Sequence, residues 1–214
     1  MKKRTKVFLI ILGVIAALIA GNIVYGALLP DIESRDGKVI YNGAEYDWDN
    51  SFTVKRAGFA AGKLGTTGER VYKAKGDDEN YFLFVQNKPF TMNRAPLART
   101  DAAEKYVSGI TTIKIQSPAF YGVEEEKAAT TDANVIGEFA DALFNSEGLI
   151  TAGANDERYS FTAISKDFED ITMGMTVIKH GGGYYVLSLS DMTTILYAPL
   201  GENASAWLNE MLNG

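Results

Sequence analysis

The sequence predicts an α+β fold: an N-terminal single transmembrane helix, then a mostly antiparallel β-sheet ectodomain with two packed helices. Three observations support this prediction: an uncharged apolar run near the start, many short β-prone runs separated by turn residues, and two later segments with helical spacing. Strands surround the helices and do not alternate with them one by one. That order favours an antiparallel α+β architecture over a parallel α/β one.

The membrane helix is predicted over residues 7–29, a run without a charged side chain. About 20 apolar residues are needed to cross roughly 30 Å of hydrocarbon as a helix. Lys2, Lys3, Arg4 and Lys6 stand in front of the run, and basic residues tend to stay in the cytoplasm. We therefore expect a single-pass protein of the cell membrane, with residues 1–6 as a cytoplasmic tail and the bulk of the chain extracytoplasmic.

A cleaved signal peptide is the rival interpretation of the same run. Signal peptides have apolar cores of about 7–15 residues and small residues before the cleavage site. This run is longer, and the sites before Gly21 and Ala27 match that pattern imperfectly. We favour a signal anchor that is not cleaved, although both interpretations export the same body.

Charge and composition narrow the possible partners. The chain has a net charge of −6. Residues 31–214 hold 17 of the 21 Lys and Arg residues and all 27 Asp and Glu residues, a net charge of −10. Such a body repels phosphate backbones, so we expect no nucleic-acid partner, and it does not favour anionic lipid headgroups. The absence of cysteine fits a bacterial envelope protein better than a small disulfide-stapled eukaryotic one.

The first part of the body is predicted to be β-structure. After a polar linker at residues 30–37, residues 38–48 surround Asn42-Gly43, a pair that favours a tight hairpin because both residues tolerate positive φ. Glycine and acidic clusters separate the further runs. We assign residues 38–96 to a small antiparallel β-unit, with these additional strands: 57–64, 70–75, 81–86 and 89–93.

The second part, residues 97–214, is predicted to be an α+β unit. Asp132 is placed to cap a helix that runs to about residue 145, with apolar side chains at helical spacing and Gly148 close behind it. A weaker helical turn is expected at 98–106 and a final helix at 203–213. The predicted strands are 111–116, 120–127, 158–164, 173–179, 184–190 and 194–198. Whether the two units share one core stays open.

Four short runs in the first unit resemble a module of small membrane-anchored or lipoprotein ectodomains of Gram-positive bacteria. The similarity covers about a quarter of the chain and rests on residues 40–46, 62–65, 71–76 and 81–85, which are rich in glycine and aromatic residues. Those proteins mostly have no assigned activity. The resemblance therefore implies a location more than a function.

The sequence lacks an assembled catalytic motif. The string His180-Gly181-Gly182-Gly183 is similar to an oxyanion loop of lipases, but the G-x-S-x-G nucleophile motif and a second histidine are absent. With one histidine and no cysteine, a zinc site would need carboxylates almost alone. We expect no catalytic residue, no metal site and no cofactor.

Aromatic residues on the first hairpin are the candidate ligand-binding residues: Tyr41, Tyr46 and Trp48 alternate with polar residues, and aromatic faces can anchor a partner. Ordinary sheet packing would explain the same pattern. The predicted function is a non-enzymatic, membrane-anchored extracytoplasmic protein that binds a protein partner or a cell-envelope component. The alternative is a carboxylate-based hydrolase acting on cell-wall glycan, which would need an acid pair about 5–10 Å apart.

Overall fold

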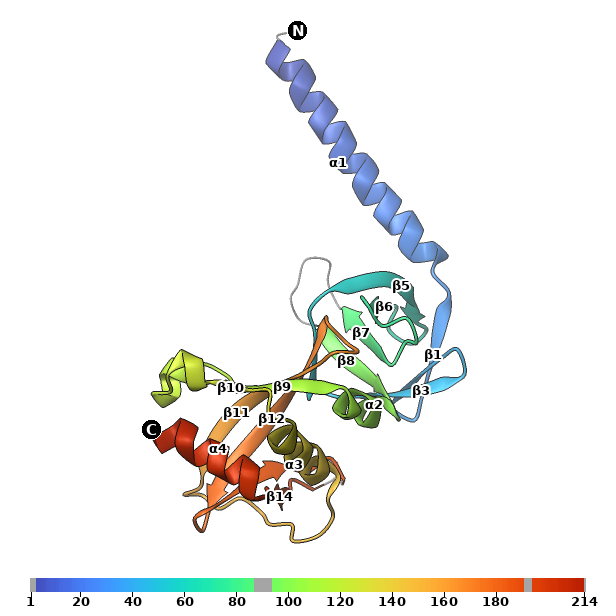
Figure 1. Cartoon of the computed structure of the whole chain (residues 1–214). Helices are drawn as coiled ribbons and strands as arrows, with labels where there is room; N and C mark the ends of the chain where they lie inside the picture. Colours follow the sequence, from blue (N-terminus) through green and yellow to red (C-terminus); the bar gives the residue numbers. More distant parts are fainter. Residues whose placement is uncertain (1–2, 87–93, 191–193, 214) are drawn as a thin grey trace.

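A long N-terminal helix projects from a β-rich body (Figure 1). The structure is a computed structural model, and it describes residues 3–86, 94–190 and 194–213. Helix α1 (Lys3–Leu28) has 26 residues and is about 39 Å long at 1.5 Å per residue. Residues 10–28 are long and apolar enough to cross a membrane, a test that a signal sequence also meets. Leu29 is already buried in the body.

The first sheet is a closed barrel of seven strands, which corrects the expectation of a simple antiparallel sheet. Its strand order is β1-β2-β3-β8-β7-β6-β5, and β1 pairs with β5 in parallel to close it. The strands are β1 (Asp31–Arg35), β2 (Lys38–Tyr41), β3 (Ala44–Trp48), β5 (Ala57–Leu64), β6 (Arg70–Ala74), β7 (Phe82–Gln86) and β8 (Arg94–Arg99).

Strand β1 comes from the segment that the sequence suggested was a polar linker. Only Ile32 of this strand is buried, so the segment lacks the alternating apolar pattern of a typical strand. Its pairing is nevertheless specific. The Lys63 N–H donates to Pro30 O at 2.9 Å, and the Gly65 N–H donates to Ile32 O at 3.1 Å. Closure of the barrel therefore depends on backbone hydrogen bonds to residues directly after α1.

The predicted Asn-Gly hairpin is confirmed between β2 and β3. Asn42 and Gly43 adopt φ values of 51° and 80°, as this tight turn requires. The strands that it joins contribute to a barrel interior of apolar side chains. The buried members of that interior are Ile32, Val39, Tyr46, Leu64, Val71, Leu83, Val85 and Leu97.

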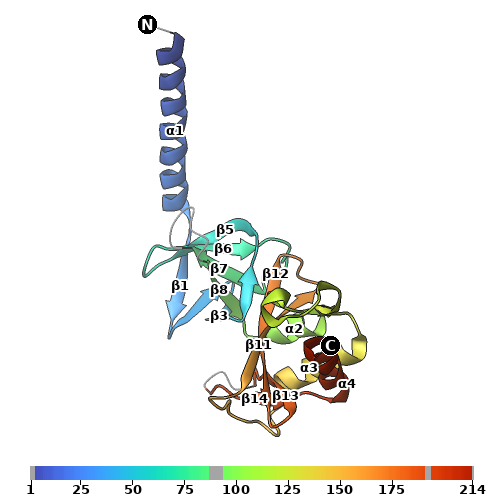
Figure 2. The same cartoon turned by 90° about the vertical axis from the view of Figure 1, so that its left-hand side faces the viewer.

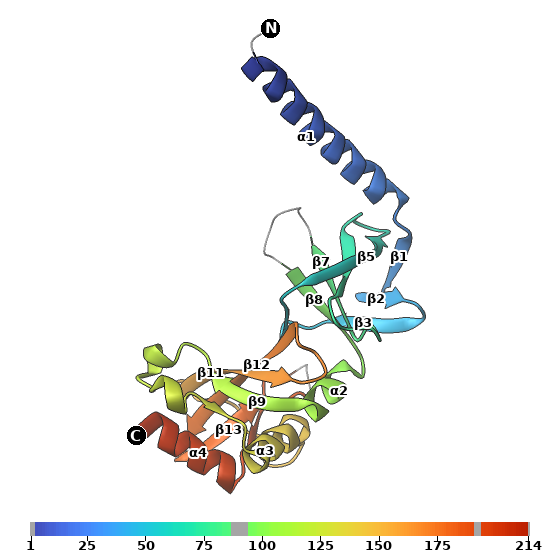
Figure 3. The same ribbon diagram turned by 45° about the horizontal axis from the view of Figure 1, so that its top comes forward.

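The second sheet has the order β10-β9-β11-β12-β13-β14, and β4 (Phe52–Val54) joins it by pairing with β12. Helices α2 (Ala102–Ser108), α3 (Ala133–Phe144) and α4 (Glu202–Asn213) lie on one side of it (Figures 2 and 3). Asp132 caps α3 as predicted, because its side chain accepts hydrogen bonds from two N–H groups of the first turn. The strands are β9 (Ile110–Ile115), β10 (Ala129–Thr130), β11 (Glu157–Ser165), β12 (Ile171–His180), β13 (Gly183–Leu187) and β14 (Tyr197–Pro199).

Three of the predicted elements differ from the structure. The strand expected at 194–198 begins only at Tyr197, as β14. The expected helical turn at 98–106 begins later, because β8 continues to Arg99. The expected strand at 120–127 is instead two short 3-10 helices, Pro118–Tyr121 and Glu125–Lys127. Left-handed backbone at Ser117 and Gly122 interrupts any extended run there. The predicted strand at 89–93 lies outside the described residues.

The barrel and the second sheet share a hydrophobic core. Phe52 of β4 packs on Phe82 of β7, with ring centroids 4.7 Å apart, and on Tyr106 of α2 at 5.3 Å. The buried Tyr106 hydroxyl donates to the Ala163 carbonyl at 2.8 Å. One continuous cluster therefore runs from the outer wall of the barrel into the second sheet.

Gly62 offers a test of barrel closure. A Cβ at this position would lie 2.6 Å from Pro30 O and 2.7 Å from Ile32 Cγ1. We expect Gly62→Ala to force β1 away from β5 and to lower the free energy of unfolding by roughly 1–3 kcal/mol. Chemical unfolding of the full chain in detergent micelles measures this. Gly65→Ala is the matched control, because its Cβ would meet Ile32 O at an ordinary 3.8 Å. Equal stability of the two variants would contradict the role of Gly62.

Candidate functional site

A large cleft lies between the barrel and the α+β part. Its volume is about 980 Å³, within the range of small-molecule sites. The ends of β3 and β8 form one wall, and helices α2 and α3 form the other. The lining residues are Asp47, Trp48, Asp49, Ala98, Arg99, Thr100, Ala103, Glu104, Val107, Ser108, Ala140, Asp141, Phe144, Leu189 and Ser190. We call this hollow the cleft.

Two large aromatic side chains of the cleft remain open to solvent. Trp48 is 45% exposed and Phe144 is 38% exposed. Trp48 comes from the last position of β3, and Phe144 comes from the last position of α3. Exposed aromatic faces in a concave site favour ligands with flat apolar surfaces or sugar rings.

Carboxylates dominate the charge of the cleft. Asp47, Asp49, Glu104 and Asp141 line it together with a single cation, Arg99. Arg99 is already engaged, since its Nε and Nη2 donate to the two carboxylate oxygens of Asp101 at 2.5 and 2.9 Å. The hydrogen bond from Arg99 lowers the pKa of Asp101. The cleft therefore favours neutral or cationic ligands over anionic ones.

The structure separates the three aromatic residues that the sequence pattern selected. Tyr46 is 1% exposed and lies inside the barrel, where its hydroxyl donates to the Asn80 carbonyl. Burial raises the pKa of Tyr46 to about 12. Tyr41 is half-buried beside it, with ring centroids 6.5 Å apart. Of the three, Trp48 alone lines the cleft.

The sequence pattern missed the contribution of α3 to the cleft. The notable residue is Phe144, which the helical spacing placed in the same apolar stripe as Val135, Phe139 and Leu143. Those three residues are buried, but Phe144 is not. It follows Leu143 directly, so it lies about 100° around the helix from the buried face. A narrower stripe would have identified Phe144 as solvent-facing.

The histidine-glycine string forms the turn between β12 and β13, with positive φ at Gly181 and Gly182. His180 Nδ1 lies 2.9 Å from Asp156 Oδ1, and the two residues lie outside the cleft. Within residues 3–86, 94–190 and 194–213, no three His, Asp or Glu side chains are grouped to hold a metal ion. Neither observation places a catalytic group at the cleft.

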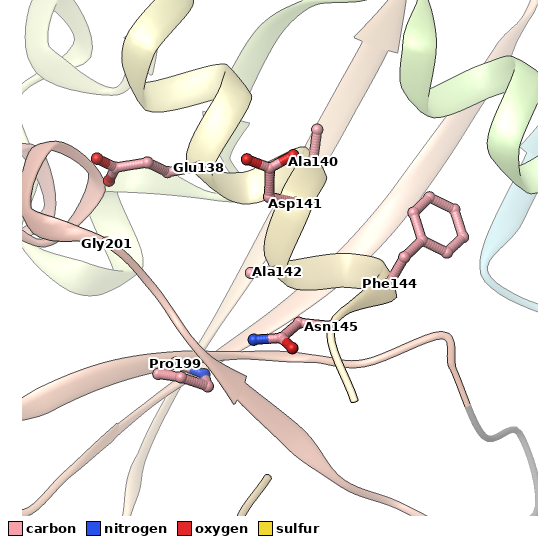
Figure 4. Close-up of a pocket in the computed structure, with 8 residues that line it drawn as sticks. All are labelled: Glu138, Ala140, Asp141, Ala142, Phe144, Asn145, Pro199 and Gly201. Atoms are coloured by element: carbon pink, nitrogen blue, oxygen red, sulfur yellow. The ribbon is translucent and has the colours of Figure 1, made fainter. Parts of the chain in front are cut away.

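A second, smaller hollow of about 550 Å³ lies beside the C-terminal half of α3 and shares Ala140, Asp141 and Phe144 with the cleft (Figure 4). Figure 4 shows Glu138 directed toward Gly201 and Phe144 pointing the opposite way. The Glu138 carboxylate accepts hydrogen bonds from the Asn203 N–H at 3.2 Å and the Ala204 N–H at 2.7 Å. It therefore caps the N-terminus of α4. This carboxylate has a structural role, so the cleft is the better candidate site.

Comparisons of the chain with models of protein families, with curated proteins and with solved structures find no match.

The Glu138 cap gives a pH-dependent prediction. Burial raises the pKa of Glu138, but hydrogen bonds from Ala204 and Asn203 outweigh it, and the net pKa is lowered. The Glu138 carboxylate therefore stabilises the folded state fully above the pKa of about 4.3 that glutamate has in the unfolded chain. This stabilisation is lost as pH falls through the lower pKa of Glu138 in the folded state. We expect Glu138→Ala to cost about 0.5–2 kcal/mol at pH 7, and less in acid. Unfolding curves of the wild type and of Glu138→Ala, recorded at pH 7 and in acid, measure this difference.

Glu147→Ala is the control for that measurement, because Glu147 is exposed on the loop after α3. It should leave stability nearly unchanged at both pH values. A Glu138→Ala penalty that persists unchanged in acid would show that the carboxylate charge is not what caps α4.

Proposed function

We propose that this chain is a non-enzymatic, membrane-anchored extracytoplasmic protein that binds a cell-envelope component or a protein partner in the cleft. The observation that carries the proposal is a half-exposed tryptophan in a large cleft between two packed units. Helix α1 would cross the cell membrane once, with its basic N-terminal residues in the cytoplasm and the body outside.

The chemistry of the cleft favours wall glycan over an anionic ligand. Neutral sugar rings offer apolar faces that can stack on Trp48, and their hydroxyl groups can donate to a carboxylate such as Asp141. A polyanion would meet several carboxylates and an arginine that Asp101 already holds. Glycan strands also lie within reach of a body anchored to the outer face of the membrane.

The same carboxylates support the alternative, a hydrolase acting on cell-wall glycan. Asp47 and Asp49 come from the barrel wall, whereas Glu104 and Asp141 come from the helices. A glycosidase needs two such groups on either side of the bond that it cleaves, one of them a general acid with a raised pKa. Release of reducing ends from the glycan distinguishes this alternative from binding without turnover.

The anchor makes a prediction about the mature protein. If α1 is not cleaved, the intact mass of protein from purified membranes corresponds to the whole chain, and the protein resists alkaline extraction but dissolves in detergent. Added protease should digest the body on intact spheroplasts. A mature chain that begins at Gly21 or Ala27 would show a cleaved signal peptide, and a freely cytosolic full-length product would contradict both interpretations.

Trp48 provides the test of ligand binding. We expect Trp48→Ala to weaken co-sedimentation of the detergent-solubilised full chain with purified peptidoglycan at least tenfold, a loss of about 1.4 kcal/mol. Phe120→Ala is the matched control, because Phe120 is an exposed aromatic residue outside the cleft. Release of reducing ends from the glycan is measured in the same samples.

The outcomes separate the two functions. Sedimentation that depends on Trp48 without release of reducing ends supports a binding protein. Release that is lost in Asp47→Asn or Asp141→Asn would support the hydrolase. Glycan binding in the cleft would be overturned if the Trp48→Ala variant co-sedimented with peptidoglycan as strongly as the wild type. It would also be overturned if the wild type did not co-sediment at all.

A further inference from the structure

The body follows α1 without a flexible linker. Helix α1 ends at Leu28, Leu29 is buried in the barrel, and β1 begins at Asp31. Arg70 of β6 holds the helix from the side: its Nη1 donates to Asn22 Oδ1 at 2.5 Å and its Nη2 to Asn22 O at 2.8 Å. If α1 spans a membrane, as the proposed function states, the barrel lies directly against the headgroups.

Strands β5 and β6 are the part of the barrel beside the end of α1. All three views show β5 below that end (Figures 1, 2 and 3). Lys63 of β5 donates its N–H to Pro30 O, two residues after the helix. Phe59 lies four residues earlier on the same strand, so it is no more than about 13 Å from this contact.

The charge of this region is opposite to that of the body. Residues 55–75 contain six Lys or Arg residues and one acidic residue, Glu69, a net charge of +5. The whole body, residues 31–214, has a net charge of −10. Two of the cations have acidic partners: Arg56 pairs with Asp170, and Lys63 pairs with Asp31 at 3.5 Å. Lys73 and Lys75 of the same segment lie on β6 and directly after it.

Phe59 is the most exposed large hydrophobic side chain in the described part of the protein, at 87%. It belongs to an irregular stretch of β5, where the register with β6 shifts between Ala57 and Ala60. A bulge of this kind turns side chains away from the regular alternation of a strand. Phe59 thus stands out from the barrel wall next to the basic segment.

We propose that the β5–β6 hairpin is a membrane-docking surface that places Phe59 in the interface of an anionic bilayer. Basic side chains near such a surface are attracted to acidic headgroups, and an aromatic ring is stable at headgroup depth. The docked hairpin would fix the tilt of the body, and with it the direction in which the cleft opens. The overall acidity of the body predicts repulsion from lipid, but the local charge beside the span decides this contact.

The test uses the full chain, whose lack of cysteine allows single spin labels. Labels are placed at Phe59→Cys, at Ile15→Cys within α1, and at Ile195→Cys as the matched control. Ile195 is 71% exposed and comes two residues before β14, and Figure 1 shows β14 at the opposite end of the body from α1. The collision rates of each spin label with oxygen, which enriches in lipid, and with a water-soluble nickel complex report whether the label lies in lipid or in water. They are compared in phosphatidylcholine liposomes with and without phosphatidylglycerol.

Charge reversal tests the electrostatic part. Lys73→Glu with Lys75→Glu should reduce the docked-to-undocked ratio at the residue 59 label by more than about thirtyfold. Loss of each basic residue removes roughly a fivefold factor, and each new carboxylate is in addition repelled by the anionic surface. The matched control is Lys179→Glu with Lys166→Glu. Lys179 lies over the Tyr184 ring as Lys73 lies over the Tyr41 ring, and Lys166 is exposed like Lys75.

The expected result is a lipid-protected label at residue 59 in anionic liposomes, lost on reversal of Lys73 and Lys75, with residue 195 in water throughout. A residue 59 label as accessible to water as residue 195, while residue 15 is lipid-protected, would overturn docking and leave the anchor intact. A water-accessible label at residue 15 would refute the anchor as well. The proposal would also be overturned if the label at residue 59 were equally lipid-protected with and without anionic lipid, and equally protected after reversal of Lys73 and Lys75.

Discussion

The parallel pairing of β1 with β5 is the contact on which the rest of the structure depends. It closes the barrel, and it does so with backbone groups of Pro30 and Ile32 that directly follow α1. One set of hydrogen bonds therefore both completes the barrel and ties the helix to the body. A barrel without open edges also avoids unpaired strand edges, which are sites of aggregation.

A cluster of aromatic rings joins the barrel to the second sheet, as the pairing of β1 with β5 joins α1 to the barrel. Phe82 from the barrel, Phe52 from β4, and Tyr106 and Phe168 from the α+β part lie within 6.2 Å of one another by the ring-centroid distances measured. Because this aromatic packing joins the units, it opposes relative movement of the two walls of the cleft. A cleft built in this way can select ligands by shape without an ordering step at binding.

Much of the fold follows from local sequence patterns, and the differences have physical causes. The Asn42-Gly43 turn and the Asp132 cap are set by neighbouring residues and were predictable. Strand β1 was not predictable. It has one buried residue and so lacks an alternating apolar pattern, and it pairs with β5, which is distant in the sequence. The cleft depends on how separate segments pack. The alternating pattern therefore selected both Trp48, which lines the cleft, and Tyr46, which belongs to the barrel interior.

The separation of charge over the body links the two proposals. Basic residues concentrate on β5 and β6 beside α1, whereas acidic residues line the cleft. Were the cleft basic, it would compete with the hairpin for the same anionic headgroups and the body would have two ways to lie on a membrane. Because the cleft is acidic, a negatively charged surface repels it while attracting the hairpin. The same charge pattern therefore favours one orientation of the body and keeps the cleft open to ligands away from the lipid.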